Sequence, residues 1–495
     1  MIFPGIDLGT TFSLVAHVNA HGQPALFPDA QDANSFRTPS VVYIGREGTL
    51  VGQAAEELLD DAPQLPLARF VKAHLDDGGW LYQDHLQRAW SAPALSALIL
   101  KKLLRDAQTF HTDELGPAVV TVPAQFTDAQ RKATLLAARL AGLAGARLIE
   151  EPVAAATYYG LDEGAADRTL LVYDFGGGTF DVTLLQSGPQ GLFVLATDGV
   201  ARLGGRHVDE AIMGLAGGAG DAASQQRLRR VAEQAKIKLA TNPALALHRQ
   251  SLLLGGVPLD FVLTRAQFEA VCQQQVDQSL LACERCLAGA GLGWRDVDKI
   301  VLTGGSSLLP AVTRSLLAVS GKAAADLVSR QPHQAVAYGA ALIAQRLGAG
   351  ADADSLVRQA SGYDLCLRVW DRQTQAPSLE TLIPRNTALP ARYSRSFFTN
   401  REDQTRLVLE FVQRRGEPAI EASLGHFAFG PILAPRRNHP VEVQVDVGSD
   451  GLIHIAARDR DLGTQLAHTL HSDGGASPAG GAQELEWVAA ARINA

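Results

Sequence analysis

The segment YDFGGGTFDVTLL at residues 173–185 combines two carboxylates with three successive glycines and a threonine. An apolar run precedes the glycines and an alternating pattern follows them, so the sequence predicts a β-hairpin with a glycine turn. Glycines adopt positive φ and let backbone N–H groups approach an anion, and a threonine adds a hydroxyl. The candidate phosphate-binding residues of this turn are Gly176, Gly177, Gly178 and Thr179.

The two carboxylates of this hairpin, Asp174 and Asp181, are suited to hold hydrated magnesium beside such an anion. A P-loop or a dinucleotide-binding fingerprint does not fit, because its glycines open a helix and a P-loop ends in Gly-Lys-Ser/Thr. A tight structural turn with solvated aspartates explains the same residues equally well. One hairpin alone therefore leaves the phosphate-binding interpretation open.

A second hairpin of the same design lies at residues 5–18, GIDLGTTFSLVAHV. Asp7 ends its first strand, and Thr10 and Thr11 follow a glycine in its turn. The repeat predicts an internally duplicated fold, in which two turns face each other across a cleft and grip phosphates from both sides. Asp7 and Asp174 would then flank one metal site.

Two segments between the hairpins carry further candidate groups. Lys72 lies in ARFVKAHLDD, where a solvated surface lysine is the ordinary alternative to a functional one. Thr127 and Gln130 form a capping box and predict an amphipathic helix. Glu151 precedes a proline at the start of the next predicted helix, which would direct its carboxylate towards the cleft.

Beyond the central hairpin, strands and helices alternate to about residue 347, which is typical of an α/β domain. A helix is predicted at 224–241, with Glu233, Lys236 and Ala240 on one face. The stretch GAGADAD at 348–354 cannot build a core and is the best linker candidate. Short alternating strands follow it and predict a β-sandwich.

Composition and net charge indicate which partners, location and cysteine chemistry to expect. A net charge of -8, with no basic stripe, gives no reason to expect a nucleic-acid or membrane partner. The start MIFPGIDLG lacks a signal-peptide pattern, so a cytosolic location is expected. The cysteines are too few for a disulfide framework, and the CxxC at 283–286 lies in a helical pattern without a second ligand pair. A helix face is therefore favoured there over a zinc or redox site.

These residues, in this order, resemble the seventy-kilodalton heat-shock protein family of DnaK-type chaperones. The similarity covers nearly the whole chain, from GIDLGTTFS through VTVPAQFTDAQRKAT, EEPVAAATYYGLD, YDFGGGTFDVTLL, LGGRHVDE and VLTGGSSLLP to VAYGAALIA. It continues through IPRNTALPARYS, LGHFAFGPI and DGLIHIAARD. The resemblance implies an α/β, actin-like, two-lobed ATPase domain, a linker and an all-β sandwich that holds extended apolar peptide.

The resemblance also implies ATP or ADP with Mg²⁺ as cofactors. The implied nucleotide contacts are Thr10, Thr11, Gly176, Gly177, Gly178, Thr179, Gly204, Gly205, Glu233, Lys236, Gly304 and Gly305. The implied metal-organising residues, acting largely through water, are Asp7, Asp174 and Glu151. The implied catalytic residues are Lys72, Glu151, Asp181 and Thr179, with Lys72 preferred to Arg69 as the family's catalytic lysine.

Three residues match positions that the family uses for coupling. Pro123 and Arg131 match its relay between the nucleotide and peptide domains, and Arg147 matches a position used with J-domain co-chaperones. A J-domain co-chaperone and a nucleotide-exchange factor are therefore candidate partners, beside unfolded or extended peptide.

The sequence also departs from the family. Ile237 and Leu308 stand where two arginines usually sandwich adenine, and Ala240 replaces the serine that reads the base. Losing these contacts would cost on the order of 1 to 3 kcal/mol of nucleotide affinity. In the linker, SLVRQAS, only Leu356 and Val357 keep the family's apolar character. The chain ends where the helical lid would begin, so fast peptide exchange is expected.

We therefore expect an ATPase domain at 1–348, a linker at 349–362, a β-sandwich at 363–472 and a flexible tail with a short helix at 473–495. The leading hypothesis is a slow ATPase chaperone without a lid. The candidate peptide contacts are Leu407, Leu409 and Phe411. The alternative is a nucleotide-regulated interaction module that hydrolyses little or no ATP. An actin-like sugar kinase would share the hairpins but lack the β-sandwich.

Overall fold

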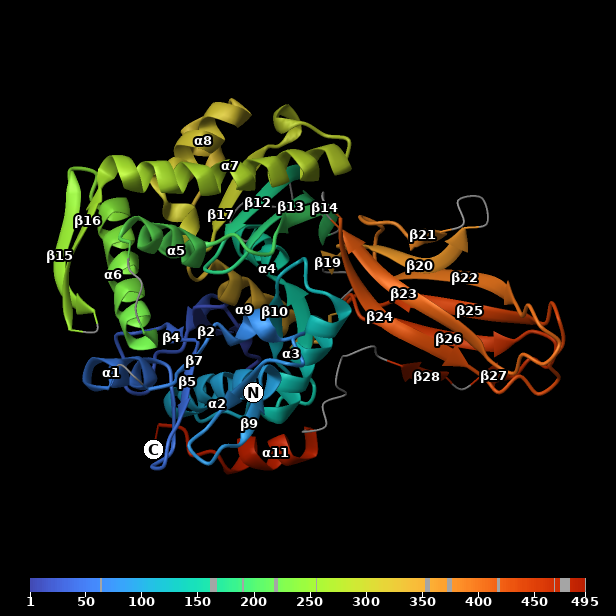
Figure 1. Cartoon of the computed structure of the whole chain (residues 1–495). Coiled ribbons are helices and arrows are strands. Elements are labelled where there is room, and N and C mark those ends of the chain that lie inside the picture. Colours follow the sequence, from blue (N-terminus) through green and yellow to red (C-terminus); the bar gives the residue numbers. More distant parts are fainter. Residues whose placement is uncertain are drawn as a thin grey trace.

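The computed structural model of the chain describes residues 1–62, 65–160, 167–188, 191–217, 221–254, 256–351, 357–371, 376–415, 419–466, 468–471 and 481–494. Figure 1 shows a large α/β body that holds the elements from β1 to α9, with the strands β20 to β28 beside it. The last helix, α11, lies back against the α/β body.

The first part of the α/β body, here called lobe I, is built on a sheet with the order β11-β10-β1-β2-β3, in which β4 also pairs with β2. The strands of this sheet are β1 (Gly5–Asp7), β2 (Phe12–Val18), β3 (Pro24–Leu26), β4 (Thr38–Pro39), β10 (Val119–Val122) and β11 (Arg147–Glu150). The smaller strands are β5 (Val41–Ile44), β6 (Thr49–Val51), β7 (Ala68–Arg69), β8 (Leu81–Gln83) and β9 (Ala89–Ser91). The helices are α1 (Gln53–Asp61), η1 (Val71–His74), α2 (Ala92–Phe110) and α3 (Asp128–Leu140).

The second part, lobe II, is built on a sheet with the order β18-β17-β12-β13-β14-β19. Its strands are β12 (Arg168–Phe175), β13 (Phe180–Gly188), β14 (Gly191–Val200), β17 (Lys299–Thr303), β18 (Leu327–Val328) and β19 (Val357–Arg358), with β15 (Leu247–Leu254) and β16 (Val257–Thr264) as a separate hairpin. Its helices are α5 (Gly205–Leu215), α6 (Ala222–Thr241), α7 (Arg265–Gly289), α8 (Pro310–Ser320), η2 (Trp294–Asp296), η3 (Gly305–Leu308) and η4 (Ala324–Asp326).

The predicted internal duplication is confirmed by the strand pairing. In lobe I, β1, β2 and β3 form an antiparallel meander, and β10 and β11 add in parallel on the other side of β1. In lobe II, β12, β13 and β14 form the same meander, and β17 and β18 add in parallel to β12. The two hairpins identified in the sequence are therefore equivalent elements of two similar sheets.

Two helices pack between the lobes, α4 (Glu151–Gly160) and α9 (Ala335–Gly348). Gly339 allows their close approach, because a Cβ on this residue would lie 1.7 Å from the carbonyl oxygen of Ala154. The start of α3 has the predicted capping box, in which Thr127 and Gln130 satisfy each other's backbone N–H groups. These local features fix the entry of α3 and the junction of the lobes.

The C-terminal strands form a β-sandwich of two sheets, ordered β21-β20-β23-β24-β28 and β22-β25-β26-β27. The strands are β20 (Asp364–Asp371), β21 (Ala376–Ile383), β22 (Ala391–Phe398), β23 (Leu407–Arg415), β24 (Ile420–Phe429), β25 (Pro440–Val447), β26 (Ile453–Asp459), β27 (Gln465–Leu466) and β28 (His468–His471). One apolar core takes side chains from both sheets, which matches the predicted alternation of inward and outward residues.

The segment that joins the α/β body to the sandwich packs against lobe II where it is described. Val357 and Arg358 form β19, which pairs in parallel with β14, and Val357 is buried. Leu356, the other apolar residue predicted for the linker, lies outside the described residues. The described part of the segment is thus an added strand of the lobe II sheet.

The short helix predicted for the C-terminal tail is present, but the expectation of flexibility is wrong for residues 481–494. The helix α11 (Gly481–Ala490) docks on lobe I, where Glu484 accepts hydrogen bonds from the backbone N–H and the hydroxyl of Ser91. Val488 and Ile493 are buried in the lobe I core. The glycine-rich composition of the tail predicted flexibility. Composition gives no sign of the apolar residues that cover this segment, because they lie hundreds of positions earlier in the chain. Residues 472–480 lie outside the described part.

Lys101 fixes the end of α11 by donating to the carbonyl oxygens of Val488, Ala489 and Ala491 at 2.7 to 3.1 Å. Asn494 then continues alongside β6, with its side chain hydrogen-bonded to both the backbone N–H and the carbonyl of Val51. The last described residues therefore behave as an extra edge of lobe I.

The cysteines are free and buried, and Cys283 and Cys286 lie on α7 as the helical pattern predicts. Among the helices of the described ranges, none has the length and apolar character needed to cross a bilayer.

Candidate functional site

The turns of the two predicted hairpins meet where the two lobes face each other. A Cβ on Gly177 would lie 2.2 Å from the hydroxyl oxygen of Thr11, and one on Gly178 would lie 3.0 Å from the methyl carbon of Thr10. A Cβ on Gly177 would clash with Thr11 and one on Gly178 would crowd Thr10, so the backbone of the second turn lies directly against the threonines of the first. The structure brings these residues together as predicted; their contact with phosphate stays a prediction.

The Gly-Gly turns surround the same hairpin. Gly205 donates its N–H to the carbonyl oxygen of Gly176 at 3.0 Å, and a Cβ on Gly204 would lie 2.7 Å from Gly177. Gly304 has φ +79°, and a Cβ there would lie 2.8 Å from a carboxylate oxygen of Asp174. Three separate glycine turns therefore meet at one point.

Gly305, next in the chain, lies against His333, because a Cβ on this glycine would be 2.7 Å from the imidazole ring. Burial lowers the pKa of His333 below its ordinary value, and the nearby Arg37 acts in the same direction. This imidazole is therefore held neutral beside the third glycine turn.

Four carboxylates gather behind the turns. Glu151, Asp174 and Asp181 are buried and Asp7 is half-buried. Burial and then the charge of Glu151 raise the pKa of Asp7 to about 7 and that of Asp181 to about 7. The same causes, with Asp181 and Asp7 added, raise the pKa of Asp174 well above its ordinary value. Mutual repulsion of this kind is what a bound cation would relieve.

The donor set fits magnesium in the water-mediated form that the sequence predicts. Within the described ranges, no group of three His, Cys, Asp or Glu side chains is close enough to hold a metal directly. Magnesium keeps several waters and takes few protein carboxylates. Asp7, Asp174 and Glu151 would therefore hold the ion through its hydration shell.

Lys72 and Arg69 have different partners, which separates the two candidates for the catalytic cation. The Nζ atom of Lys72 lies 2.5 Å from Oε1 of Glu151, and this lysine is buried. Arg69 instead pairs with Glu56 at a partly exposed position. Lys72 is thus the cation that the structure places among the carboxylates. Its predicted alternative, a solvated surface lysine, is wrong because the amine needs the Glu151 charge when buried.

The residues that the resemblance places around the nucleoside lie on α6 and η3. Lys236 donates to the carbonyl oxygen of Gly205 at 3.2 Å and pairs with Asp209 at 2.8 Å, and Glu233 lies one turn earlier on the helix. Ile237 and Leu308 leave about half of their surface exposed, at 51% and 48%. Apolar side chains are therefore open where the resemblance would place guanidinium groups, and the half-buried Ala240 adds no polar group.

Phe70 connects the lobes in a way that sequence reasoning missed. Its ring packs under the guanidinium groups of Arg206 and Arg229, with the central carbons 5.0 and 5.5 Å from the ring centroid. Phe70 also has φ +56°, which is unusual for a bulky residue and marks a strained position. Phe70 belongs to lobe I and both arginines belong to lobe II, so this contact joins the two lobes, two residues before Lys72 in the chain.

The predicted coupling residues occupy different surroundings. Arg131 donates to Glu150 at 2.8 Å within lobe I and to the carbonyl oxygen of Asp450 in the β-sandwich at 3.0 Å. Pro123 is buried in the loop before α3, and Arg147 is exposed on β11, the edge strand of the sheet. Arg131 is thus at the domain junction, and Arg147 is open to a partner.

The predicted peptide contacts are wrong for two of three residues. Leu407 and Phe411 are buried in the sandwich core, and Leu409 is half-buried against it. The period-two stripe faces the opposite sheet, while Val408, between Leu407 and Leu409, points away from the core and is 56% exposed. A fully buried ring has no surface to offer a peptide, so this stripe is core.

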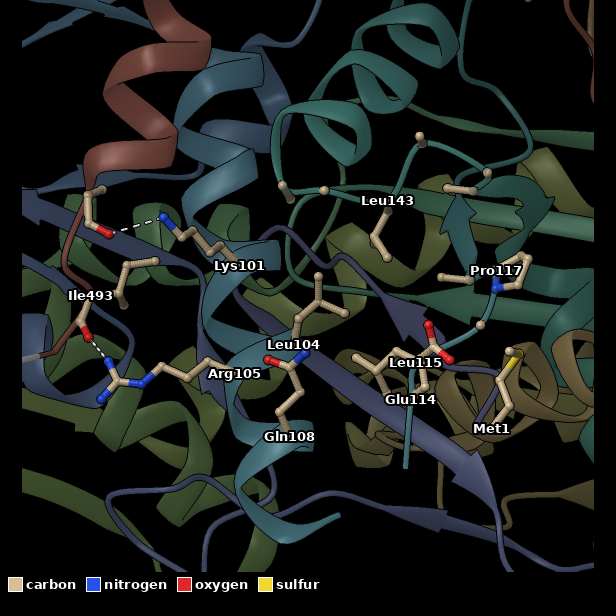
Figure 2. Close-up of a pocket in the computed structure, with 18 of the residues that line it drawn as sticks. Met1, Lys101, Leu104, Arg105, Gln108, Glu114, Leu115, Pro117, Leu143 and Ile493 are labelled. Atoms are coloured by element: carbon tan, nitrogen blue, oxygen red, sulfur yellow. Dashed lines mark hydrogen bonds between the residues drawn. The ribbon is translucent and has the colours of Figure 1, made fainter. Parts of the chain in front are cut away.

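A cavity of about 1020 Å³ lies away from this site, between α2, the loop after α3 and residues 491–493 (Figure 2). Lys101 and Arg105 line it but donate to carbonyl oxygens of the C-terminal segment. No predicted site residue lines this cavity. It belongs to the docking of the C-terminal segment rather than to the cleft.

A protein-family model described as "Hsp70 protein" matches residues 56–486 of the 495-residue chain. The match spans lobe II, the β-sandwich and lobe I from residue 56 onward, and it includes the central hairpin and the Gly-Gly turns. The chain therefore belongs to the Hsp70 family.

Proposed function

We propose that this protein is an ATP-dependent chaperone of the cytosol, which binds exposed apolar segments of unfolded proteins and hydrolyses ATP slowly with Mg²⁺. Membership of the Hsp70 family supports a nucleotide-dependent chaperone function in general, since members of the family are ATPases that bind peptides and co-chaperones. The finer points, namely hydrolysis by this chain and the peptide it binds, are our proposal.

The observation that carries the proposal is the meeting of two glycine and threonine turns over four carboxylates and one buried lysine. Backbone N–H groups and the hydroxyls of Thr10, Thr11 and Thr179 would bind the phosphates. Bound Mg²⁺ would neutralise the charge that develops on the transferred phosphoryl group. Lys72 would hold the terminal phosphate, and Asp181 would orient the attacking water and accept its proton.

The second candidate is an interaction module that binds nucleotide without hydrolysing it. The exposed Ile237 and Leu308 favour this alternative, because an apolar base pocket gives weak adenine selectivity. On either proposal, Arg147 is a candidate contact for a J-domain co-chaperone, and the β-sandwich would take up extended peptide.

Single-turnover hydrolysis of ATP with Mg²⁺ tests the first proposal. Phosphate release from the wild type, lowered about 100-fold or more in Asp174→Asn, is the expected result. The exposed Asp32 offers a matched control, Asp32→Asn, which should behave as wild type. If the wild type releases no phosphate at saturating ATP but still binds ATP by calorimetry, the interaction module is the correct function.

A further inference from the structure

Arg206 and Arg229 converge on one carboxylate oxygen and one aromatic ring. Arg206 lies in the first turn of α5 and Arg229 lies in α6, and both approach Oε1 of Glu210, at 3.3 and 3.9 Å. Both guanidinium groups also lie over the ring of Phe70. Two cations from different helices of lobe II therefore meet at one place beside lobe I.

The contacts with Glu210 leave hydrogen-bond donors unused. The approach of Arg229 at 3.9 Å is too long for a hydrogen bond, and Nε of Arg206 is buried with no hydrogen-bond partner in the described part of the chain. A guanidinium carries five N–H donors in its plane, and contact with an aromatic ring engages its face. The edges of both groups can therefore serve a ligand that accepts hydrogen bonds.

The charges around Arg206 are mostly positive. Burial lowers the pKa of Arg206, Glu210 opposes this effect, and the charges of Arg229 and Arg202 lower the pKa further. Arg202 is exposed and forms no ion pair within the described ranges. Three arginines thus stand against one carboxylate, and a bound anion would relieve the repulsion between them.

His207, the next residue of α5, is a further unsatisfied group. Its two ring nitrogens are buried, and neither has a hydrogen-bond partner among the residues that the structure describes. Burial and then the charge of Arg206 lower the pKa of His207, Glu210 opposes them, and Arg202 lowers it further. An anion bound beside Arg206 would offset the same two cations here.

This group of side chains is adjacent to the proposed phosphate turns but separate from them. The backbone N–H of Arg206 donates to the carbonyl oxygen of Gly177 at 2.8 Å, while its guanidinium lies over Phe70. Phe70 is held at φ +56°, and a bulky residue keeps such a strained conformation where the surrounding structure requires it. The ring thus provides a fixed platform for both guanidinium groups.

We propose that Arg206 and Arg229, with Phe70 as their platform, form a second anion site, which binds a phosphate group beside the proposed nucleotide site. The inference rests on the proposed function and deepens it, because ATP hydrolysis would release inorganic phosphate next to these arginines. Arginines bind phosphate through paired, charge-assisted N–H donors. Glu210 is a competing internal anion, and its side chain, which is 39% exposed, has room to leave when phosphate binds.

Titration of inorganic phosphate onto the full-length protein, saturated with Mg²⁺ and a non-hydrolysable ATP analogue, tests the site without hydrolysis. The analogue occupies the place of the terminal phosphate, so calorimetry detects phosphate bound elsewhere. One phosphate should bind, and Arg206→Gln and Arg229→Gln should each raise its Kd about 10-fold or more, the range for losing a charge-assisted hydrogen bond. Glu210→Gln should lower the Kd about 2- to 5-fold, because a competing charge is removed.

Arg227→Gln is the matched control. Arg227 lies on the same helix as Arg229, is exposed and donates to the carbonyl oxygen of Leu253, so its variant should bind phosphate as the wild type does. A purely structural role of the group would not give opposite effects in Arg206→Gln and Glu210→Gln. No phosphate binding by the wild type, or an unchanged Kd in Arg206→Gln and Arg229→Gln, would overturn the proposal.

A single-turnover experiment with a fluorescent phosphate sensor identifies the source of the phosphate. Release that lags behind hydrolysis in the wild type, with a shorter lag in Arg206→Gln, would identify the product of hydrolysis as the ligand. Release without a lag, in a wild type that binds added phosphate, would identify free phosphate instead. A wild type that hydrolyses no ATP but shows the opposite effects on phosphate binding would refute the ATPase function and retain the site.

Discussion

Replacing Asp181 by asparagine should stabilise the nucleotide-free protein, and it should do so mainly at alkaline pH. Asp181 is 1% exposed, and burial with the charge of Glu151 raises its pKa to about 7, from an ordinary value of 3.8. The folded state therefore binds more protons than the unfolded state between about pH 4 and pH 7. Stability linked to this group is present at low pH and is lost as the pH rises through 7.

The magnitude follows from the difference of about 3 pKa units at about 1.36 kcal/mol each. Ionising Asp181 in the folded state costs about 4 kcal/mol of stability at pH 8 and under about 2 kcal/mol at pH 5. Asparagine keeps the shape and can still accept the hydrogen bond from Gln125, but it carries no charge. Asp181→Asn should therefore gain about 2 to 3 kcal/mol more at pH 8 than at pH 5.

Urea unfolding of the nucleotide-free, EDTA-treated protein at both pH values measures this difference. The exposed Asp32 serves again as the control, and Asp32→Asn should shift the midpoint equally, if at all, at the two pH values. An equal gain at pH 5 and pH 8 would show that Asp181 is not a strained carboxylate. A loss of stability at pH 8 would show that its charge is satisfied by neighbours, and the argument for a cation among these carboxylates would fail with it.

Four further predictions test other parts of the structure. Lys72→Gln should lower single-turnover hydrolysis about 100-fold or more, while Arg69→Gln should change it little, as measured by phosphate release. Phe70→Leu should speed ADP dissociation about 5- to 30-fold in a fluorescent-nucleotide chase, because two cation–π contacts across the cleft are lost; Phe110→Leu, at an exposed position, should not. Val488→Ala should lower the free energy of unfolding of the lobe I transition by about 1 to 3 kcal/mol, and Glu486→Ala by less than about 0.5 kcal/mol. Phe411→Ala should destabilise the β-sandwich by about 3 to 5 kcal/mol in calorimetry, rather than weaken peptide binding at unchanged stability.

The sequence predicted well what depends on local pattern and repetition. The glycine hairpins, the capping box at Thr127 and the helix at 224–241 each need only neighbouring residues for their signal, and the structure has them within about two residues. The duplication also predicted that the turns of the two glycine hairpins face each other. Pairing across the cleft followed from that symmetry and needed no knowledge of the intervening chain.

The sequence predicted poorly where an outcome depends on what covers a surface. The stripe of Leu407 and Phe411 has the same alternating pattern whether it faces a second sheet or a peptide. In the structure it faces the opposite sheet, so both side chains belong to the core. Gln125 lies inside the quoted segment VTVPAQFTDAQRKAT, yet its partners are 56 and 290 positions away, at Asp181 and Arg415. A polar residue between a proline and a capping box carries no local sign of such contacts.

In the linker only Leu356 and Val357 keep the family's apolar character, but the two domains are joined by several other contacts. The β-sandwich is attached to lobe II through β19 and Arg385, which pairs with Asp198 at 3.0 Å, and to lobe I through Arg131 and Gln125. Charge-assisted bonds of this kind contribute about 1.5 to 3 kcal/mol each, so separating the domains must overcome several of them together.

The C-terminal segment provides a second connection between the β-sandwich and the α/β body. Because residues 481–494 are anchored on lobe I, the β-sandwich is held to the α/β body both before β20 and after β28. A chain fixed at both ends explores less space when its contacts break, which raises the effective concentration for redocking. A nucleotide-driven release of the sandwich would therefore have to act at the bonds around Gln125 and Arg131 rather than at the linker.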